Sequence, residues 1–194
     1  MQEEKTDKEL IKSFLSGEDD GSFEILIKKY LKDVYSFAYH FSSNKAEAED
    51  ITQETFVKVW KNIKKFDGER SFKTWIFSIA KNTAIDYFRK KKSVPFSFLD
   101  NEETGTEFAD TVRDETPLQD ELAELSMMKD KLDVAIKRLP EIYKNIIFLR
   151  YSEDLTFEEI SEVYGESINT VKSRYRRGMI ALKEIIKKMH PKRS

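Results

Sequence analysis

The sequence predicts an all-α protein with two small helical domains, joined by an acidic flexible linker, and a helix-turn-helix in the second domain. Apolar residues recur at intervals of three and four along most of the chain, and no alternating strand pattern appears. The composition favours helices with solvated outer faces, since 36% of residues are charged and glycine and proline number only 6 and 4. We expect domains at residues 1–92 and 119–194, with the linker at 93–118.

The composition also excludes several classes of protein. The chain has no cysteine, so a disulfide scaffold and a thiolate metal site are excluded. The N-terminus is polar, and no apolar run approaches membrane-spanning length. His40 and His190 are far apart, and phosphate-binding loops and nucleophile elbows are absent from the sequence. We therefore expect a cytoplasmic binding protein that is not an enzyme and uses no cofactor and no metal.

Charge is distributed unevenly along the chain, although its net value is only −2. Residues 93–121 carry one arginine and nine acidic residues, whereas 122–194 carry 15 Lys/Arg and 11 Asp/Glu. Within 167–194 nine Lys/Arg face a single acidic residue, Glu184. Such local concentration of cations is typical of a nucleic-acid-binding surface. The alternative is an ordinary solvated basic face.

The first domain is expected to contain three amphipathic segments, at about 5–41, 46–66 and 71–92. The first is interrupted at 17–21, and Ser71 is a candidate cap of the third. In the second, the apolar stripe contains Ile51, Phe56, Val59, Trp60 and Ile63. Each stripe is interpreted as core.

Two phenylalanines of the third segment, Phe77 and Phe88, fall outside its apolar stripe and among cations. Exposed aromatic rings beside positive charge suit single-stranded nucleic acid, because a base can stack on the ring while the cation contacts the backbone. The alternative is that another helix covers both rings. After this segment, residues 93–118 lose helical periodicity, gain acids and hold two of the four prolines, which indicates a linker.

The stretch 156–177 predicts the helix-turn-helix. Thr156 and Glu159 have capping-box spacing, Gly165 can end the first helix, and Ser167 can cap the second. The second helix has an apolar face of Ile168, Val171, Tyr175 and Leu182. Outside that face lie Asn169, Thr170, Lys172, Ser173, Arg174, Arg176 and Arg177. An ordinary helical hairpin with a basic face is the alternative.

Two blocks of sequence resemble the bacterial RNA polymerase sigma factors of the extracytoplasmic-function (ECF) type. AEAEDITQETFVKVWKNIKKFDGERSFKTWIFSIAKNTAIDYFRKKK at 46–92 is similar to regions 2.2 to 2.4 of that family, and LPEIYKNIIFLRYSEDLTFEEISEVYGESINTVKSRYRRGMIALKEII at 139–186 is similar to region 4. The resemblance implies a protein that binds core RNA polymerase and directs promoter-specific initiation at minus-10 and minus-35 elements. Its alternatives are a free-standing helix-turn-helix regulator and a pure interaction protein.

The resemblance also implies three sets of contact residues. Contacts with the clamp of the largest polymerase subunit fall on Asp50, Gln53, Glu54 and Phe56. Contacts with the melted non-template strand of the minus-10 element fall on Phe72, Phe77, Lys81, Asn82 and Arg89. Contacts with the minus-35 duplex fall on Ser167, Asn169, Thr170, Lys172, Ser173, Arg174, Arg176 and Arg177.

Further expectations concern the linker, a regulator and two departures from the family pattern. In this family the acidic linker runs toward the RNA exit channel, and an anti-sigma factor often clamps both domains. The exposed hydrophobic faces permit such a partner here without requiring it. Asn169 stands where the family often has glycine, and Gly178 where alanine is usual.

Overall fold

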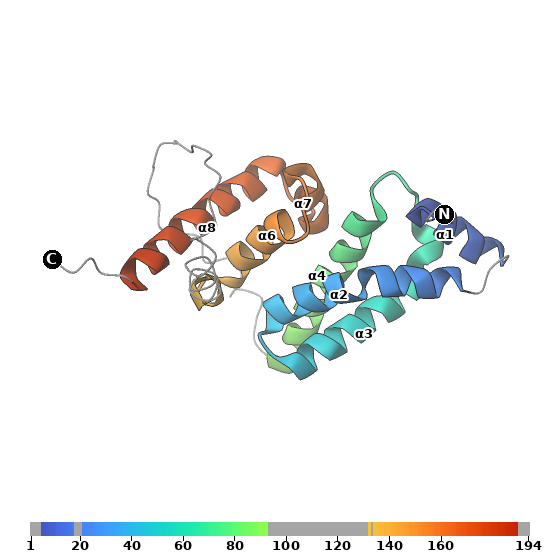
Figure 1. The fold of residues 1–194 in the computed structure, drawn as a ribbon, viewed down its shortest axis with the longest axis horizontal. Coiled ribbons are helices and arrows are strands. Elements are labelled where there is room, and N and C mark those ends of the chain that lie inside the picture. The colour runs from blue at the N-terminus through green and yellow to red at the C-terminus, as the bar shows by residue number, and fades with distance from the viewer. Residues whose placement is uncertain (1–4, 18–20, 93–131, 133, 190–194) are drawn as a thin grey trace, which may run out of the picture.

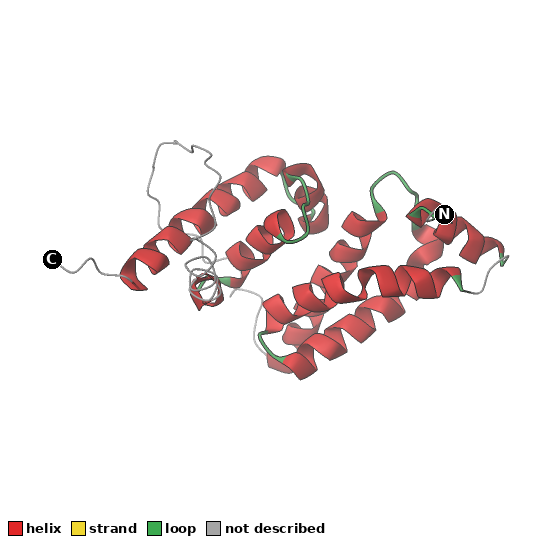
Figure 2. Cartoon of the chain, in the orientation of Figure 1, coloured by secondary structure: helices red, strands yellow, loops and turns green. Residues whose placement is uncertain are grey.

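The computed structural model describes residues 5–17, 21–92, 132 and 134–189 of the 194-residue chain. Within these ranges all regular secondary structure is helical, which confirms the predicted fold class (Figures 1 and 2). The expected linker at 93–118, and most of the helix expected from residue 119, lie outside the described residues. No helix in the described part is long and apolar enough to cross a membrane.

The N-terminal half folds as a group of packed helices (Figure 1). They are α1 (Asp7–Ser16), α2 (Ser22–Ser42), α3 (Lys45–Asn62) and α4 (Phe72–Lys92), with a short 3-10 turn η1 (Ile63–Lys65) after α3. Helix α2 lies along α3 and also contacts α1 and α4, and α3 contacts α4. The predicted break at 17–21 separates α1 from α2, and Gly17 adopts a left-handed φ of 74° at the end of α1.

The C-terminal half contains α6 (Glu141–Tyr151), α7 (Phe157–Tyr164) and α8 (Ile168–Met189). Pro140 precedes α6 directly, where its missing N–H is no loss because the first amides of a helix have no intrahelical partner. Helix α8 runs beside α6 and contacts α7 near its beginning (Figure 1). A small apolar cluster between α6 and α8 includes Leu139, Ile147 and Leu182.

The main core lies among α2, α3 and α4. Its fully buried side chains come from the predicted stripes, and burying each one stabilises the fold by roughly 1.5–3 kcal/mol. They include Leu26, Val34, Phe37, Ile51, Val59, Ile63 and Ile76. The same apolar cluster continues into the C-terminal half through Phe148, Leu149, Leu155, Ile160 and Val163. The two halves therefore pack against each other, α2 against α6 and α4 against α7.

Two aromatic side chains lie where the sequence pattern did not place them. Phe77, expected outside the buried stripe, has no exposed surface and packs edge-on against Phe37 with ring centroids 5.6 Å apart. Helix α4 contacts α2, α3 and α7, so its buried face is wider than one stripe. Trp60, expected in the core, is 56% exposed, because α3 buries positions such as Thr55, Phe56 and Val59 instead.

Candidate nucleic-acid interface

The helix-turn-helix forms through the local interactions that its sequence predicts. Thr156 and Glu159 make a reciprocal capping box at the start of α7, with the Glu159 amide donating to the Thr156 hydroxyl at 3.1 Å. Gly165 ends the helix at a left-handed φ of 66°, a conformation that costs glycine no steric strain. The Thr170 amide then donates to the Ser167 hydroxyl at 3.1 Å, which caps α8.

Helix α8 turns one side into the fold and leaves a polar, cationic side in solvent. Val171, Gly178 and Leu182 are buried. Six of the eight residues predicted to contact the minus-35 duplex are exposed: Ser167, Asn169, Lys172, Ser173, Arg176 and Arg177. The surface therefore has the amides, hydroxyls and guanidinium groups that reach base edges and phosphates in a major groove.

The other two predicted contacts, Thr170 and Arg174, are half-buried and already engaged. The Thr170 hydroxyl lies 2.8 Å from that of Ser167 in the helix cap. Arg174 forms an ion pair with Glu166 in the turn before α8, and both side chains are largely covered. Arg174 thus fixes the turn to the recognition helix in this conformation.

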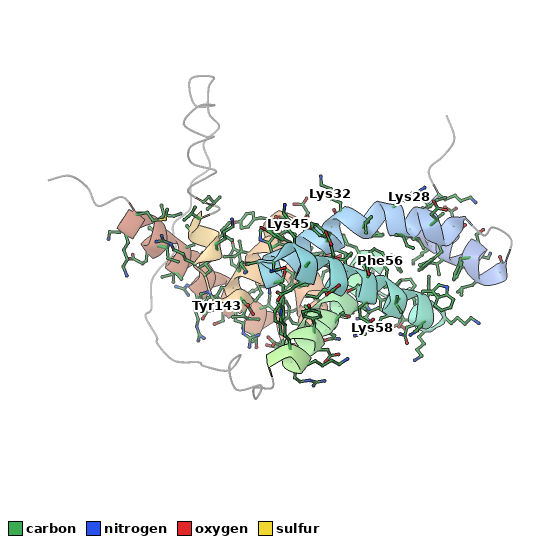
Figure 3. All side chains as sticks on the ribbon, turned by 90° about the horizontal axis from the view of Figure 1, so that it is seen from below. Lys28, Lys32, Lys45, Phe56, Lys58 and Tyr143 are labelled. Atoms are coloured by element: carbon green, nitrogen blue, oxygen red, sulfur yellow. The ribbon has the colours of Figure 1, made fainter. Side chains whose placement is uncertain are left out.

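Gly178 lies where α8 packs tightly against α6. A Cβ atom built on Gly178 would lie 3.0 Å from the Cβ of Tyr143 and 3.2 Å from Cδ1 of Ile147. Tyr143 is labelled on α6 in Figure 3. The unusual glycine therefore permits close helix packing, which the sequence alone did not indicate.

A second polar surface surrounds a pocket of about 310 Å³ between the end of α3 and α4. The Trp75 side chain, although 94% buried, contributes to the wall. The remaining lining residues are mostly amides and cations: Lys58, Asn62, Lys65, Arg70, Ser78, Ile79 and Asn82. Of these, only Asn82 was predicted to contact the minus-10 element. Three pairs of lining residues lie four positions apart on one helix, a signal in the sequence that was not used: 58 with 62, 75 with 79 and 78 with 82.

The remaining residues predicted to contact the minus-10 element differ in how exposed they are. Phe72 and Phe77 are 3% and 0% exposed, so the expectation that Phe77 offers an exposed ring is wrong, and both rings belong to the core. Arg89 is exposed near the end of α4 and pairs with Asp86 at 3.0 Å. Phe88 is half-buried, with its ring stacked on Phe41.

Lys81 is directed toward α7. Its ammonium group lies 3.5 Å from the Tyr164 carbonyl oxygen and 5.5 Å from the centre of the Tyr164 ring. Burial lowers the pKa of Lys81, and the negative charge of Glu166 opposes part of that change.

The predicted polymerase-binding residues divide into exposed and buried groups. Asp50, Gln53 and Glu54 are exposed on α3, whereas Phe56 is only 9% exposed and packs in the core, as its place in the apolar stripe predicted (Figure 3). Val57 and Trp60 follow at helical spacing on the same outer side as Gln53 and are 42% and 56% exposed. This acidic and aromatic surface was only partly predicted.

Together, these features define a two-domain helical DNA-binding protein. The outer side of α8 suits the groove of a duplex. The first domain carries the cationic pocket between α3 and α4 and the acidic, aromatic outer side of α3. No cluster of three or more metal-ligating side chains occurs among the residues that the structure covers. The chain matches the family Sigma-70 region 2 at residues 26–94 and Sigma-70, region 4 at residues 129–182.

Similarity to individual proteins extends over almost the whole chain. The ECF RNA polymerase sigma factor SigW of Bacillus subtilis is 36% identical over 181 residues, covering 91% of this chain and 95% of the relative. The ECF RNA polymerase sigma-E factor of Haemophilus influenzae is 32% identical over 179 residues, covering 90% and 92%.

The protein belongs to the ECF sigma factors. It binds core RNA polymerase and promoter DNA and directs transcription initiation.

Solved structures share the fold across both domains. CnrH in complex with the cytosolic domain of CnrY has a TM-score of 0.64 at 20% identity, covering 93% of this chain and 96% of that one. The sigma factor RpoE in complex with the anti-sigma factor NepR, from Bartonella quintana, has a TM-score of 0.62 at 24% identity, covering 86% and 98%.

Proposed function

We propose that this sigma factor divides promoter recognition and polymerase binding among three surfaces. The outer side of α8 reads the minus-35 duplex, the pocket between α3 and α4 binds the melted minus-10 strand, and the outer side of α3 binds the polymerase clamp. The observation that carries the proposal is the pocket, because it combines a tryptophan wall, two asparagine amides and several cations in one place.

The pocket suits an unstacked base joined to a phosphate backbone. Removing a base from the stack costs a few kcal/mol, and aromatic stacking returns about 1–3 kcal/mol per base. The amides of Asn62 and Asn82 can both donate to and accept from base edges. Lys65 and Arg70 at the rim supply cations for the flanking phosphates. Arg89, further along α4, extends the same positive surface.

The exposed side of α8 suits direct readout in the major groove. Asn169 and Ser173 have hydrogen-bonding side chains one helical turn apart, within reach of base edges. Lys172, Arg176 and Arg177 are exposed cations suited to phosphates on either side. Arg174, also predicted to contact the minus-35 duplex, can do so only after its side chain leaves Glu166.

For the polymerase contact, we extend the predicted residues Asp50, Gln53 and Glu54 to Val57 and Trp60. Aromatic residues are enriched at the centre of protein interfaces, and hot spots are enriched in tryptophan. An exposed Trp60 beside carboxylates can therefore anchor a cationic partner surface. Phe56 supports this surface from inside the core.

We also propose that the protein acts without chemistry of its own in the cytoplasm, where the polymerase works. The domain limits proposed from the sequence, 1–92 and 119–194, leave an acidic tether at 93–118 that allows the two DNA-reading surfaces to separate. A cytoplasmic anti-sigma partner is a further proposal, supported by the solved sigma factors of similar fold that were captured with such partners.

A promoter-substitution experiment tests whether each DNA-binding surface recognises the promoter element assigned to it. Holoenzyme is reconstituted with wild type, Asn82→Ala, Asn169→Ala or Lys32→Ala, and initiation is measured on promoters changed one base pair at a time. Each base contact is worth about 1–3 kcal/mol of discrimination, roughly 5- to 150-fold in initiation. We expect Asn82→Ala to relax discrimination only in the minus-10 element and Asn169→Ala only in the minus-35 element.

Lys32→Ala is the control, because the Lys32 ammonium group projects from the outer side of α2 (Figure 3). It should initiate like wild type on every promoter. The proposal fails if Asn82→Ala changes preference in the minus-35 element, or if neither asparagine variant alters base preference while all variants bind polymerase normally.

A further inference from the structure

A row of polar contacts joins the last turns of α4 to the outer side of α3. The Tyr87 hydroxyl donates to the Asp50 carboxylate, with an oxygen-to-oxygen distance of 3.2 Å. One turn further along α4, Lys91 forms an ion pair with Glu47, which lies one turn before Asp50 on α3. These four side chains therefore form one polar cluster on the surface of the first domain.

The row continues along α3 to the side chain of Lys58, which is labelled in Figure 3. Its ammonium group lies 3.9 Å from the Glu54 carboxylate and 3.8 Å from the carboxylate of Asp86, the residue before Tyr87. Lys58 also lines the pocket that we assign to the melted strand. Residues 86, 87 and 91 of α4 thus contact the outer side of α3, where two of the carboxylates assigned to polymerase lie.

The fold itself does not depend on the Tyr87 hydroxyl. Helices α3 and α4 both contribute side chains to the main core, among them Ile51 and Ala84, which are fully buried. The Tyr87 ring packs edge-on against Phe88 with ring centroids 5.5 Å apart, a contact that does not involve the hydroxyl. Polar contacts at the surface contribute little to stability. The effect of this hydroxyl is therefore expected in binding rather than in folding.

A carboxylate that binds a protein partner benefits from being held in place beforehand. An exposed aspartate that is free to rotate loses that freedom on binding, which weakens the complex. The Tyr87 hydroxyl binds one oxygen of Asp50, Oδ2, and leaves Oδ1 with its lone pairs for a donor from the partner. A tyrosine has only two χ angles, so it is a rigid support for such a carboxylate.

The charges around Asp50 favour the same arrangement. Burial, the hydrogen bond to Asp50 and the negative charge of Asp50 raise the pKa of Tyr87, so its hydroxyl stays protonated and donates. The hydrogen bond to Glu47 likewise raises the pKa of Lys91, which keeps its positive charge. Lys91 thereby offsets the charge of Glu47, which would otherwise repel Asp50 one turn away.

We propose that Tyr87 is a positioning residue for polymerase binding: its hydroxyl orients the Asp50 carboxylate that meets the polymerase clamp, and Lys91 supports it by holding Glu47. The inference rests on the proposed contact between Asp50 and polymerase. It gives α4, the helix that carries Asn82 of the strand-binding pocket, a second role at the polymerase surface.

A double-mutant cycle on polymerase affinity tests this role. Core RNA polymerase is titrated with the wild-type chain, Tyr87→Phe, Asp50→Ala and the combined variant. Tyr87→Phe removes only the hydroxyl and should weaken binding by about 2- to 10-fold, the usual contribution of one hydrogen bond. The same substitution should have no further effect in the Asp50→Ala background. A merely structural role of Tyr87 would instead weaken binding equally in both backgrounds.

Tyr30→Phe is the matched control, because it breaks another tyrosine-to-aspartate hydrogen bond of the same domain. The Tyr30 hydroxyl donates to Asp7 and joins α2 to α1. Since Tyr30 is only 5% exposed, its variant should lose more thermal stability than Tyr87→Phe. It should nevertheless bind polymerase like wild type. Melting temperatures of all variants show that each is folded at the temperature of the titration.

Lys91 provides an independent check on the supporting contact. Lys91→Met removes the charge and keeps an unbranched side chain, whereas Lys91→Arg retains the charge. We expect Lys91→Met to weaken polymerase binding by about 2- to 5-fold, as for a surface ion pair, and Lys91→Arg to bind like wild type. Equal affinities of wild type and Lys91→Met would overturn the supporting role of Lys91.

The outcomes of the cycle distinguish this inference from the contact on which it rests. If Asp50→Ala binds polymerase as tightly as wild type, the assignment of Asp50 to polymerase is wrong, and the role of Tyr87 is wrong with it. If Asp50→Ala weakens binding but Tyr87→Phe does not, the polymerase contact stands and the positioning role is overturned. The positioning role is equally overturned if Tyr87→Phe weakens binding to the same extent in both backgrounds.

Discussion

Phe77 shows how a single residue can change the interpretation of a surface. Its position among lysines indicated an exposed ring for a base, but the ring is fully buried against Phe37. Helical periodicity reports one buried stripe, whereas α4 contacts three other helices and buries more of its circumference. Trp60 is the converse case, an aromatic residue of the apparent stripe that is 56% exposed.

Alanine substitutions should separate these two roles. Phe77→Ala removes a fully buried ring, so we expect unfolding free energy to fall by about 3–5 kcal/mol. Trp60→Ala should change it by about 0.5 kcal/mol or less, because the ring is mostly in solvent, and should weaken binding to core polymerase. Urea denaturation measures the unfolding free energy, and a titration with core polymerase measures the binding affinity. Equal losses of stability in the two variants would contradict the assignment.

Gly178 supports a prediction that opposes helix propensity. Replacing glycine by alanine inside a helix normally stabilises it by up to about 1 kcal/mol. Here the new Cβ would lie 3.0 Å from the Cβ of Tyr143, an atom held close to the α6 backbone. We therefore expect Gly178→Ala to lower the melting temperature. A rise in melting temperature would show that α8 can move away from α6 at little cost.

At the scale of elements, local sequence signals predicted the helix ends well. The capping box of Thr156 with Glu159, the left-handed Gly165 and the Ser167 cap are all confirmed, because each depends on residues three or four positions apart. The pocket between α3 and α4 was not predicted as a whole, since its residues come from two helices and the loop between them. Tertiary packing, which the sequence pattern does not contain, brings them together.

The exposed side of α8 leads to a prediction about salt. Arg176 is exposed and assigned to a phosphate, so Arg176→Ala should weaken promoter binding by holoenzyme equally for all base sequences. The slope of log affinity against log salt should fall by about 1, corresponding to one phosphate contact. Lys183→Ala, an exposed cation further along α8, is the comparison. Loss of preference for one base pair in Arg176→Ala would instead make Arg176 a base contact.

At the scale of the whole molecule, the docking of the two domains was not predictable from the sequence. In the sequence pattern, Phe148 is one more apolar position of α6. Nothing in its spacing indicates that it contacts α2. Lys73 and Glu153 are 80 positions apart and each looks like a solvated charge. Long-range pairs of this kind appear only in three dimensions.

Lys144 of α6 is a buried lysine, only 4% exposed, and leads to a prediction about stability. Methionine has a similar unbranched length without the charge, and replacing buried charges by apolar residues is often stabilising. Burial lowers the pKa of Lys144, which reflects the cost of keeping it charged. We expect Lys144→Met to raise the melting temperature, because it removes a buried charge. A lower melting temperature would show that the Lys144 ammonium group makes a favourable contact in the folded protein.

The central claim is that this chain directs polymerase to promoters through two separate surfaces, and mapping of transcript starts tests it most directly. Core RNA polymerase is mixed with the purified protein and fragmented genomic DNA, and the 5′ ends of the transcripts are sequenced. The account predicts start sites preceded by two shared elements at a fixed spacing, with Asn82→Ala relaxing the downstream element and Asn169→Ala the upstream one. Scattered starts, or one shared element that both variants alter alike, would contradict it.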